Sequence, residues 1–262
     1  MEHVQLAVDV DKITFEQEQN ELVKFILNER FFKSWENYDP NNYDSLCNES
    51  CLEIFITSSC NQKCKYCYLY NNTDLYPPEI NNEELILSNL NILCDWIEKK
   101  KFFISRIELY SGEIWHNSYG LEVLEILYSH LSQCQWTRQI IIPSNCSFVL
   151  DEIQLSKIQR YINKFNRIGI SLCFSISVDG MIIEDAVRPL NNHTVKTEEF
   201  YERLFLFARH NTFYFHPMVA AESISLWKEN VQWWKNMCDK YGLDFEEYMM
   251  LLEVRNPNWT DE

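Results

Sequence analysis

Short β-rich segments alternate with longer helical segments from residue 52 onward, and this alternation constrains the fold more than any other feature. We expect strands at residues 52–57, 104–110, 138–143, 170–178, 212–219 and 248–254. Such alternation specifies parallel strands joined by right-handed helical crossovers. Because six strands are fewer than the eight of a closed α/β barrel, the sequence predicts an open, partial (β/α)6 parallel barrel.

Between the expected strands, apolar residues recur at three- and four-residue steps, the period of an amphipathic helix. We expect helices at residues 82–98, 118–132, 150–165, 197–210 and 226–241. The last five residues are typical of a helix start, with Thr260 as the N-cap. We therefore expect the sequence to be a fragment of a longer protein, without the last helix of its barrel.

Residues 1–51 do not follow the strand and helix alternation and are expected to form a separate N-terminal extension. Apolar side chains within residues 15–35 recur at three- and seven-residue steps, which predicts an amphipathic helix that caps the barrel or binds a partner. Residues 52–262 are expected to form the α/β core. A chain of 262 residues can bury a large core, and one domain with an appendage fits as well as two domains.

The composition favours a packed globular protein and excludes several classes. Hydrophobic residues make up 46% of the chain, which argues against disorder. The net charge of -16 would repel a phosphate backbone, so we do not expect extended nucleic acid as a partner. The sequence contains neither a transmembrane run nor a signal peptide, so we expect a cytoplasmic protein without a membrane partner.

Three closely spaced cysteines, Cys60, Cys64 and Cys67, directly follow the first expected strand. Three thiolates can hold three irons of a four-iron cluster and leave the fourth iron open to bind something else. Cys47 and Cys51 lie just upstream and could supply a fourth thiolate, which would close the site. The five isolated cysteines are expected to be buried, because free cysteine is among the most buried residue types; they are Cys94, Cys134, Cys146, Cys173 and Cys238.

Polar residues alternate with apolar ones on the fourth expected strand. Cys173, Ser175, Ser177 and Asp179 fall on one face, which could line a polar lumen or form a half-exposed edge. Glycines follow the second and fourth strands, at Gly112 and Gly180, where a backbone must turn sharply or approach a ligand closely. Gly169 and Gly242 follow helices and are expected to be left-handed helix caps.

The Cys-x3-Cys-x2-Cys run, with Tyr66 before its third cysteine and a strand before its first, resembles the signature of the radical S-adenosylmethionine (radical SAM) enzymes. Three later segments resemble landmarks of that family in order and spacing. The segment 110–114 resembles its Gly-Gly-Glu-Pro, Ser144-Asn145 its Thr-Asn-Gly, and 175–180 its Ser-Leu-Asp-Gly. In this sequence Ser111 replaces the first glycine and Ile114 replaces the proline. The resemblance covers about residues 52–254.

The resemblance implies a reduced 4Fe-4S cluster on Cys60, Cys64 and Cys67 that cleaves S-adenosylmethionine. The products would be methionine and a 5′-deoxyadenosyl radical that abstracts hydrogen from a substrate. The resemblance also implies the residues that bind S-adenosylmethionine: Tyr66 near adenine, Gly112 and Glu113 at the methionine amine, Asn145 in the third landmark, and Ser175, Ser177, Asp179 and Arg188 at the ribose or carboxylate.

The pattern is closest to the SPASM or twitch-type maturases, which modify peptides or proteins and carry a cysteine-rich C-terminal region that this sequence does not show. A peptide or protein side chain is therefore the expected substrate, and a flavodoxin or ferredoxin the expected one-electron donor. A small metabolite or nucleotide fits the same core. A non-enzymatic zinc or iron–sulfur module and a silent scaffold remain alternatives. His216 at the end of the fifth strand, and Glu253 with Arg255 after the sixth, could contact the substrate or could be a structural histidine and a rim ion pair.

Overall fold

The computed structural model describes residues 51–71, 81–188, 197–250 and 252–253. The chain divides into two units at Ser50 and Cys51, and the described residues all belong to the second unit. Several expectations lie outside the described residues: the helix within 15–35, the role of Cys47, the position of Arg255 and the helix start at Thr260.

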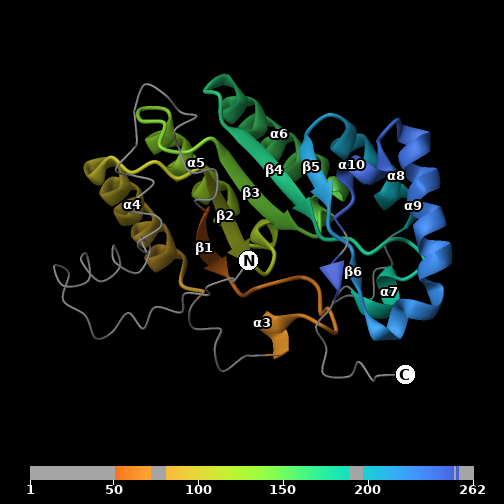
Figure 1. The fold of residues 1–262 in the computed structure, drawn as a ribbon. Coiled ribbons are helices and arrows are strands. Elements are labelled where there is room, and N and C mark those ends of the chain that lie inside the picture. Colours follow the sequence, from red (N-terminus) through yellow and green to blue (C-terminus); the bar gives the residue numbers. More distant parts are fainter. Residues whose placement is uncertain (1–50, 72–80, 189–196, 251, 254–262) are drawn as a thin grey trace, which may run out of the picture. The chain divides into compact units, whose positions relative to one another are not determined.

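A parallel five-stranded sheet forms the centre of the described structure, with its strands in the order β1-β2-β3-β4-β5 (Figure 1). The strands are β1 (Cys51–Thr57), β2 (Arg106–Ser111), β3 (Gln139–Ser144), β4 (Ser171–Ile176) and β5 (Thr212–Phe215). All four strand pairs are parallel, which places every carboxyl end at the same edge of the sheet. The expected α/β class with an open parallel sheet is confirmed.

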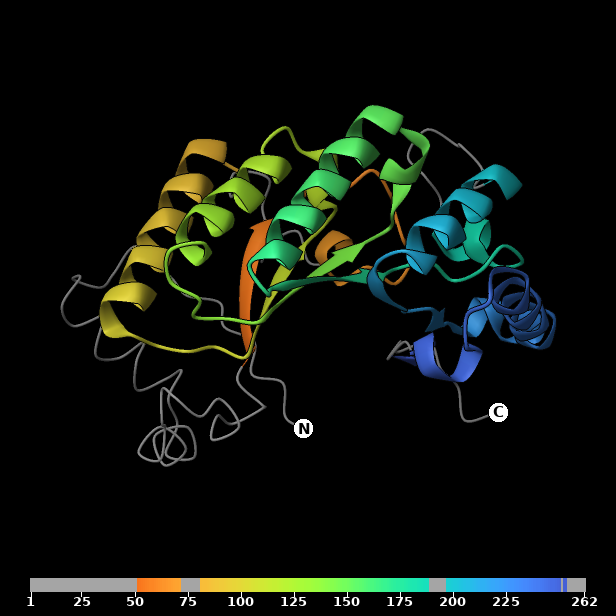
Figure 2. The same ribbon diagram turned by 90° about the horizontal axis from the view of Figure 1, so that it is seen from above.

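Helices connect the strands, and the three after β1, β2 and β3 lie side by side on one face of the sheet (Figure 2). The five expected helices are present as α4 (Glu83–Lys100), α5 (Gly120–Leu131), α6 (Glu152–Arg167), α8 (Glu198–Arg209) and α9 (Trp227–Tyr241). The shorter helices are α3 (Tyr68–Asn71), α7 (Glu184–Val187), α10 (Phe245–Tyr248) and the 3-10 turns η3 (Ile114–His116), η4 (Ser147–Leu150) and η5 (Ala221–Leu226). None of the described helices combines the length and apolarity needed to cross a bilayer.

Local sequence explains where the long helices begin and end. Asn82 and Asp151 cap α4 and α6, because each side chain accepts a hydrogen bond from a backbone N–H of the first turn. Gly169 and Gly242 have positive φ angles of 75° and 69°, so both expected left-handed caps are confirmed. Lys101 adopts the same conformation after α4, with φ 56°, although it carries a side chain.

The apolar face of the sheet packs against the helices and forms the core. On β4, Leu172, Phe174 and Ile176 are buried in this core, while the intervening Ser175 lines a cavity on the other face. Each fully buried Leu, Ile or Phe contributes roughly 1.5–3 kcal/mol of transfer free energy. The alternation expected for the fourth strand is therefore confirmed, but only Ser175 and Ser177 of its polar face line the cavity, whereas Cys173 and Asp179 are buried and are not part of its wall.

The end of the predicted barrel differs from the expectation. Residues 212–219 form two strands, β5 and β6 (Met218–Val219), because Pro217 lacks the N–H needed to continue the ladder. The predicted sixth strand at 248–254 is also shorter: Met249 makes one bridge to Phe215, and β7 (Leu252–Glu253) pairs with β6 in a separate sheet. Its predicted start at Tyr248 is wrong, because Asp244 caps α10 there.

Candidate radical SAM site

The cysteine loop follows β1 at the carboxyl edge of the sheet. Cys60, Cys64 and Cys67 are all part of the wall of one cavity of about 460 Å³. The loop turns tightly, since the Cys67 N–H donates to the Cys64 carbonyl at 3.0 Å. The Gln62 N–H points at the Cys60 Sγ at 3.3 Å. The loop therefore presents three thiols to the same space.

Backbone hydrogen bonds hold the cysteine loop against the end of β2. The Gly112 N–H donates to the Thr57 carbonyl at 2.6 Å, and the Glu113 N–H donates to the Ser59 carbonyl at 2.9 Å. A Cβ at position 112 would lie 2.4 Å from the Ser59 carbonyl oxygen. Glycine is required at position 112 because the backbone of the cysteine loop passes so close.

Two of the three thiols, those of Cys60 and Cys64, have raised pKa values that favour the protonated form. Burial, together with the Glu113 carboxylate, raises the pKa of Cys60 to about 12. Burial also raises the pKa of Cys64 to about 11. Since a thiolate is the metal-binding form, binding of a metal at this loop must release protons.

Nine of the eleven predicted site residues line the cavity. They are Cys60, Cys64, Tyr66, Cys67, Gly112, Asn145, Ser175, Ser177 and Arg188. The other two, Glu113 and Asp179, are 1% and 0% exposed and lie behind the wall. The resemblance implied direct contacts for both, whereas their carboxylates here bind neighbouring protein groups.

Glu113 joins the ends of β2 and β3. Its carboxylate accepts hydrogen bonds from the Ser144 hydroxyl at 3.0 Å and from the Asn145 N–H at 2.7 Å. The Asn145 amide in turn donates to Asn61 of the cysteine loop at 2.7 Å. Through Asn61 and Ser144, hydrogen bonds thus link the cysteine loop to the ends of β2 and β3. The sequence pattern alone did not indicate this link.

Cys146 occupies the position of the glycine in the third landmark. Its φ is 56°, in the left-handed region that glycine tolerates best, and its side chain is buried. Cys146 therefore adopts a backbone conformation that would suit a glycine at this position.

Asp179 is a buried connection between three segments. Its Oδ2 accepts hydrogen bonds from the Tyr66 hydroxyl and from Arg188 Nε, the latter at 2.8 Å. Its Oδ1 accepts one from the Met218 N–H at 2.7 Å. Burial raises the pKa of Tyr66 well above its usual value, so the phenol stays protonated and donates. Asp179 therefore positions Tyr66 and Arg188, which do line the cavity.

The turn after β4 depends on residues that the sequence interpretation missed. The Glu184 carboxylate accepts hydrogen bonds from the N–H groups of Asp179 and Gly180. From α9, Asn230 and Trp234 both donate to the Asp179 carbonyl. Gly180 has φ 108°, which confirms the sharp turn expected there. The four-residue spacing of Asn230 and Trp234 was the available signal, since it places both on one helix face.

The two substitutions in the Gly-Gly-Glu-Pro landmark, Ser111 and Ile114, have different surroundings. Ile114 is fully buried in the core, where it begins η3. Ser111 lines the cavity, and its hydroxyl oxygen is buried without a hydrogen-bond partner among the described residues. His216, predicted as a possible substrate contact, also lines the cavity. The side chain of Glu253 lies outside the described residues.

Cys51 is too far away to close the metal site. It begins β1, whereas the cysteine loop follows the end of that strand at Thr57. Six residue steps of a β-strand span about 20 Å, and a thiolate ligand must lie about 2.3 Å from its metal. Cys51 instead hydrogen-bonds with Arg106 at the opposite edge of the sheet.

The isolated cysteines mostly follow the expectation. Cys94, Cys146, Cys173 and Cys238 are buried, as predicted. The prediction is wrong for Cys134, which is exposed because it lies in the loop after α5.

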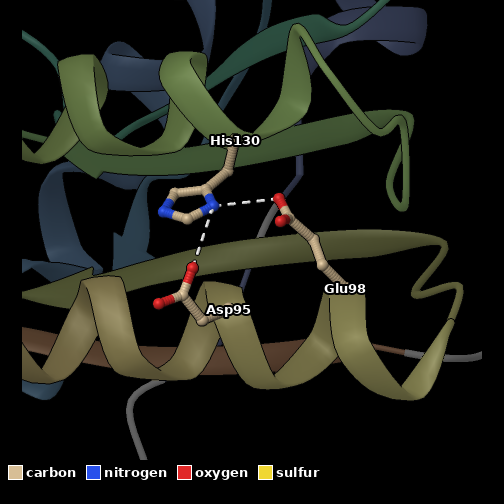
Figure 3. A group of neighbouring side chains, drawn as sticks. All are labelled: Asp95, Glu98 and His130. Atoms are coloured by element: carbon tan, nitrogen blue, oxygen red, sulfur yellow. Dashed lines mark hydrogen bonds and ion pairs between the residues drawn. The ribbon is translucent and has the colours of Figure 1, made fainter.

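A second group of candidate metal ligands joins α4 and α5 (Figure 3). His130 Nδ1 lies 2.9 Å from Glu98 Oε1 and 3.8 Å from Asp95 Oδ1. Asp95 is 75% exposed, and His130 also contacts Asn91 through Nε2 at 3.4 Å. The imidazole therefore already has polar partners on the neighbouring helix, and the group is a cluster of polar side chains between α4 and α5.

Three solved structures have similar folds. The structure of anSMEcpe with bound AdoMet gives a TM-score of 0.55 over 81% of this chain and 54% of that chain, at 14% identity. The structure of anSMEcpe with AdoMet and a Cp18Cys peptide gives 0.52 over 80% and 53%, also at 14% identity. Streptococcus suis SuiB bound to S-adenosylmethionine gives 0.54 over 99% and 49%, at 11% identity.

Both matched proteins are radical SAM peptide maturases. This chain has the radical SAM fold. It spans about half the length of the solved structures that it matches. No family model and no curated protein matches the sequence. The resemblance predicted from the cysteine spacing and the three later landmarks is confirmed in the fold.

Proposed function

We propose that this protein is a radical SAM enzyme whose 4Fe-4S cluster is held by Cys60, Cys64 and Cys67. The observation that carries the proposal is the position of the three thiols, which share one cavity at the carboxyl edge of a radical SAM fold. In parallel α/β folds, ligands bind at this edge of the sheet.

The residues present fit a cluster with one open iron. Thiolates are the usual ligands of iron–sulfur clusters, and the loop supplies three of them. Cys51 cannot become the fourth, because it lies at the other end of β1. Two buried polar atoms in the cavity wall, on Ser111 and His216, lack partners among the described residues and are available to a ligand.

When bound and reduced, the cluster supplies the electron that cleaves S-adenosylmethionine to methionine and a 5′-deoxyadenosyl radical able to abstract hydrogen from a substrate. The chain's own residues bind and orient the nucleotide. Arg188 offers a guanidinium for the carboxylate, and Ser177 offers a hydroxyl for a polar group. Tyr66 provides an aromatic face for the adenine.

The buried carboxylates of Asp179 and Glu113 support the residues that make these contacts. Asp179 fixes Tyr66 and Arg188, so its contribution to S-adenosylmethionine binding is positioning. The Glu113 carboxylate similarly fixes Asn145, while the Glu113 backbone N–H holds the loop end at Ser59. Rigid support of this kind keeps the reacting groups within the narrow range of productive geometry.

A peptide or protein side chain is the substrate that we propose. The proposal is supported by the similar fold of anSMEcpe, whose solved structure contains a Cp18Cys peptide. A small metabolite or nucleotide is the alternative substrate class. Reduction of the cluster requires a one-electron donor, for which we propose a flavodoxin or ferredoxin.

Anaerobic reconstitution with iron and sulfide tests the activity. We expect about four irons per chain, a reduced cluster signal in electron paramagnetic resonance that changes on adding S-adenosylmethionine, and release of 5′-deoxyadenosine. The Cys64→Ala variant should lose all three, while Cys173→Ala, a buried cysteine outside the loop, should retain them. A reconstituted cluster that neither responds to S-adenosylmethionine nor releases 5′-deoxyadenosine would contradict the proposal.

The substrate class needs a separate experiment. The peptide fraction and the small-molecule fraction of an extract from the source organism are each added to the reconstituted enzyme. We expect the peptide fraction to accelerate 5′-deoxyadenosine release. Acceleration by the small-molecule fraction alone would favour the alternative substrate class.

A further inference from the structure

Two side-chain atoms in the cavity wall are buried and have no hydrogen-bond partner in the described part of the chain. They are Oγ of Ser111 and Nε2 of His216. An unpaired buried polar atom is unfavourable, so most such atoms in native proteins are satisfied by protein, water or ligand. Their shared position in one cavity wall points to the cavity's ligand as the missing partner.

The two atoms belong to strands that are well separated in the sheet. Ser111 ends β2, and His216 directly follows β5, three strands away in the sheet. Three inter-strand spacings correspond to about 14 Å, and less across a curved sheet. A ligand that satisfies both atoms must therefore be elongated and must lie across the carboxyl ends of the strands.

His216 is held in place by its neighbours. Its N–H donates to the Ile176 carbonyl at 2.8 Å, and its Nδ1 lies 3.2 Å from the Ser175 hydroxyl. Burial, and then the charge of Arg188, lowers the pKa of His216, so the imidazole stays neutral. A neutral ring whose Nδ1 is already engaged has one nitrogen left for a ligand hydroxyl.

Ser111 lies beside the metal end of the cavity. It is adjacent to Gly112, whose N–H is bonded to the end of β1 just before the cysteine loop. The glycine of the family pattern has no side chain, whereas Ser111 adds a hydroxyl at this point. When a ligand approaches the cysteine loop, its polar groups therefore come near this hydroxyl.

We propose that Ser111 and His216 are this chain's own contacts to the two ends of S-adenosylmethionine. Ser111 Oγ binds the amino-acid end, because Ser111 adjoins Gly112, which the resemblance places at the methionine amine. His216 Nε2 binds a ribose hydroxyl at the nucleoside end. The inference rests on the proposed function, since it takes S-adenosylmethionine as the ligand of this cavity.

Binding to the reconstituted protein, measured by isothermal titration calorimetry, separates the two contacts. The probes are S-adenosylmethionine and 5′-deoxyadenosine, which lacks the amino-acid end. Loss of one neutral hydrogen bond weakens binding by about 2- to 12-fold. Ser111→Ala should weaken the binding of S-adenosylmethionine by this factor and leave the affinity for 5′-deoxyadenosine unchanged. His216→Leu should weaken the binding of both probes by similar factors.

Matched variants control for structural effects. His210→Leu and Ser132→Ala change an exposed histidine and a serine at the end of α5, and should leave both affinities unchanged. His216→Gln keeps a polar atom in the cavity and should recover part of the affinity lost in His216→Leu. Iron content and circular dichroism show whether each variant is folded. If His216→Leu does not fold, His216→Gln replaces it in the test.

The outcomes distinguish this inference from the proposed function. Wild-type protein that binds neither probe overturns both. Wild-type protein that binds S-adenosylmethionine while His216→Leu and His216→Gln bind it equally well overturns the contact at His216 alone. Equal weakening of both probes by Ser111→Ala overturns its assignment to the amino-acid end.

Discussion

Arg188 donates a hydrogen bond from Nε to Oδ2 of Asp179 at 2.8 Å, and the two side chains are only 8% and 0% exposed. The guanidinium also lies over the Tyr66 ring, with its central carbon 5.0 Å from the ring centroid. A single carboxylate therefore fixes both an aromatic ring and a cation at the cavity wall. The pair is buried, so removing one partner leaves an uncompensated charge.

Asp179→Asn should lower the free energy of unfolding by about 3 kcal/mol, because it leaves the buried Arg188 without its counter-charge. Chemical denaturation of wild type and variant measures this. Glu199→Gln breaks an exposed pair with Arg203 and should change stability by less than about 0.5 kcal/mol. Equal stabilities for Asp179→Asn and wild type would show that the pair is not needed to hold the fold.

Gly112→Ala should reduce iron incorporation, because the added Cβ would meet the Ser59 carbonyl oxygen at 2.4 Å and displace the cysteine loop. Gly169→Ala is the matched control. Its Cβ meets nothing within 4 Å, so it should be unfavourable only through its left-handed backbone, by about 1–2 kcal/mol. Iron per chain after reconstitution is the measurement, and full incorporation in Gly112→Ala would contradict the close-approach argument.

The fold was predictable where the sequence is periodic and locally consistent. The five long helices combine apolar periodicity with cap residues such as Asn82 and Asp151, so each was found near its true bounds. The error at the end of the barrel came from treating 212–219 as one strand despite Pro217. Asp244, three residues before Glu247, was an N-cap signal that the strand interpretation of this region overlooked.

The sequence predicted which residues lie at the site, but it did not predict which contact each of them makes. Cysteine spacing and strand order are local, and they placed nine residues around one cavity. The roles depend on contacts between distant positions, such as Tyr66 with Asp179, which are 113 residues apart. No local pattern shows that the carboxylates of Glu113 and Asp179 bind protein groups, nor that the Ser111 hydroxyl has no partner among the described residues.

His216 should make stability depend on pH below neutrality. Burial, and then Arg188, lowers its pKa in the folded state below the ordinary value near 6.5, while Asp179 opposes this shift. The unfolded chain therefore binds a proton that the folded chain does not, and stability falls as pH decreases from about 6.5 toward the lowered pKa. Between pH 6.5 and 5.5 the loss is at most about 1.4 kcal/mol.

Denaturant unfolding at several pH values between 5.5 and 7.5 measures this slope. His216→Leu should have a flatter profile than wild type over this range, because it cannot take up the proton in either state. His210→Leu replaces an exposed histidine and should keep the wild-type slope. Parallel profiles for wild type and His216→Leu would show that the imidazole titrates alike in both states.

The fourth iron should have no cysteine ligand from the described residues. Cys51→Ala should retain full iron content, because β1 separates Cys51 from the loop by about 20 Å. Cys64→Ala should lose the cluster, because it removes one of only three thiolates on the loop. The same assay on Cys47→Ala decides between an open and a closed site. Iron loss as complete as in Cys64→Ala would identify a fourth thiolate and favour the non-catalytic metal module, whereas retained iron with an S-adenosylmethionine-dependent change in the cluster signal would support the open iron.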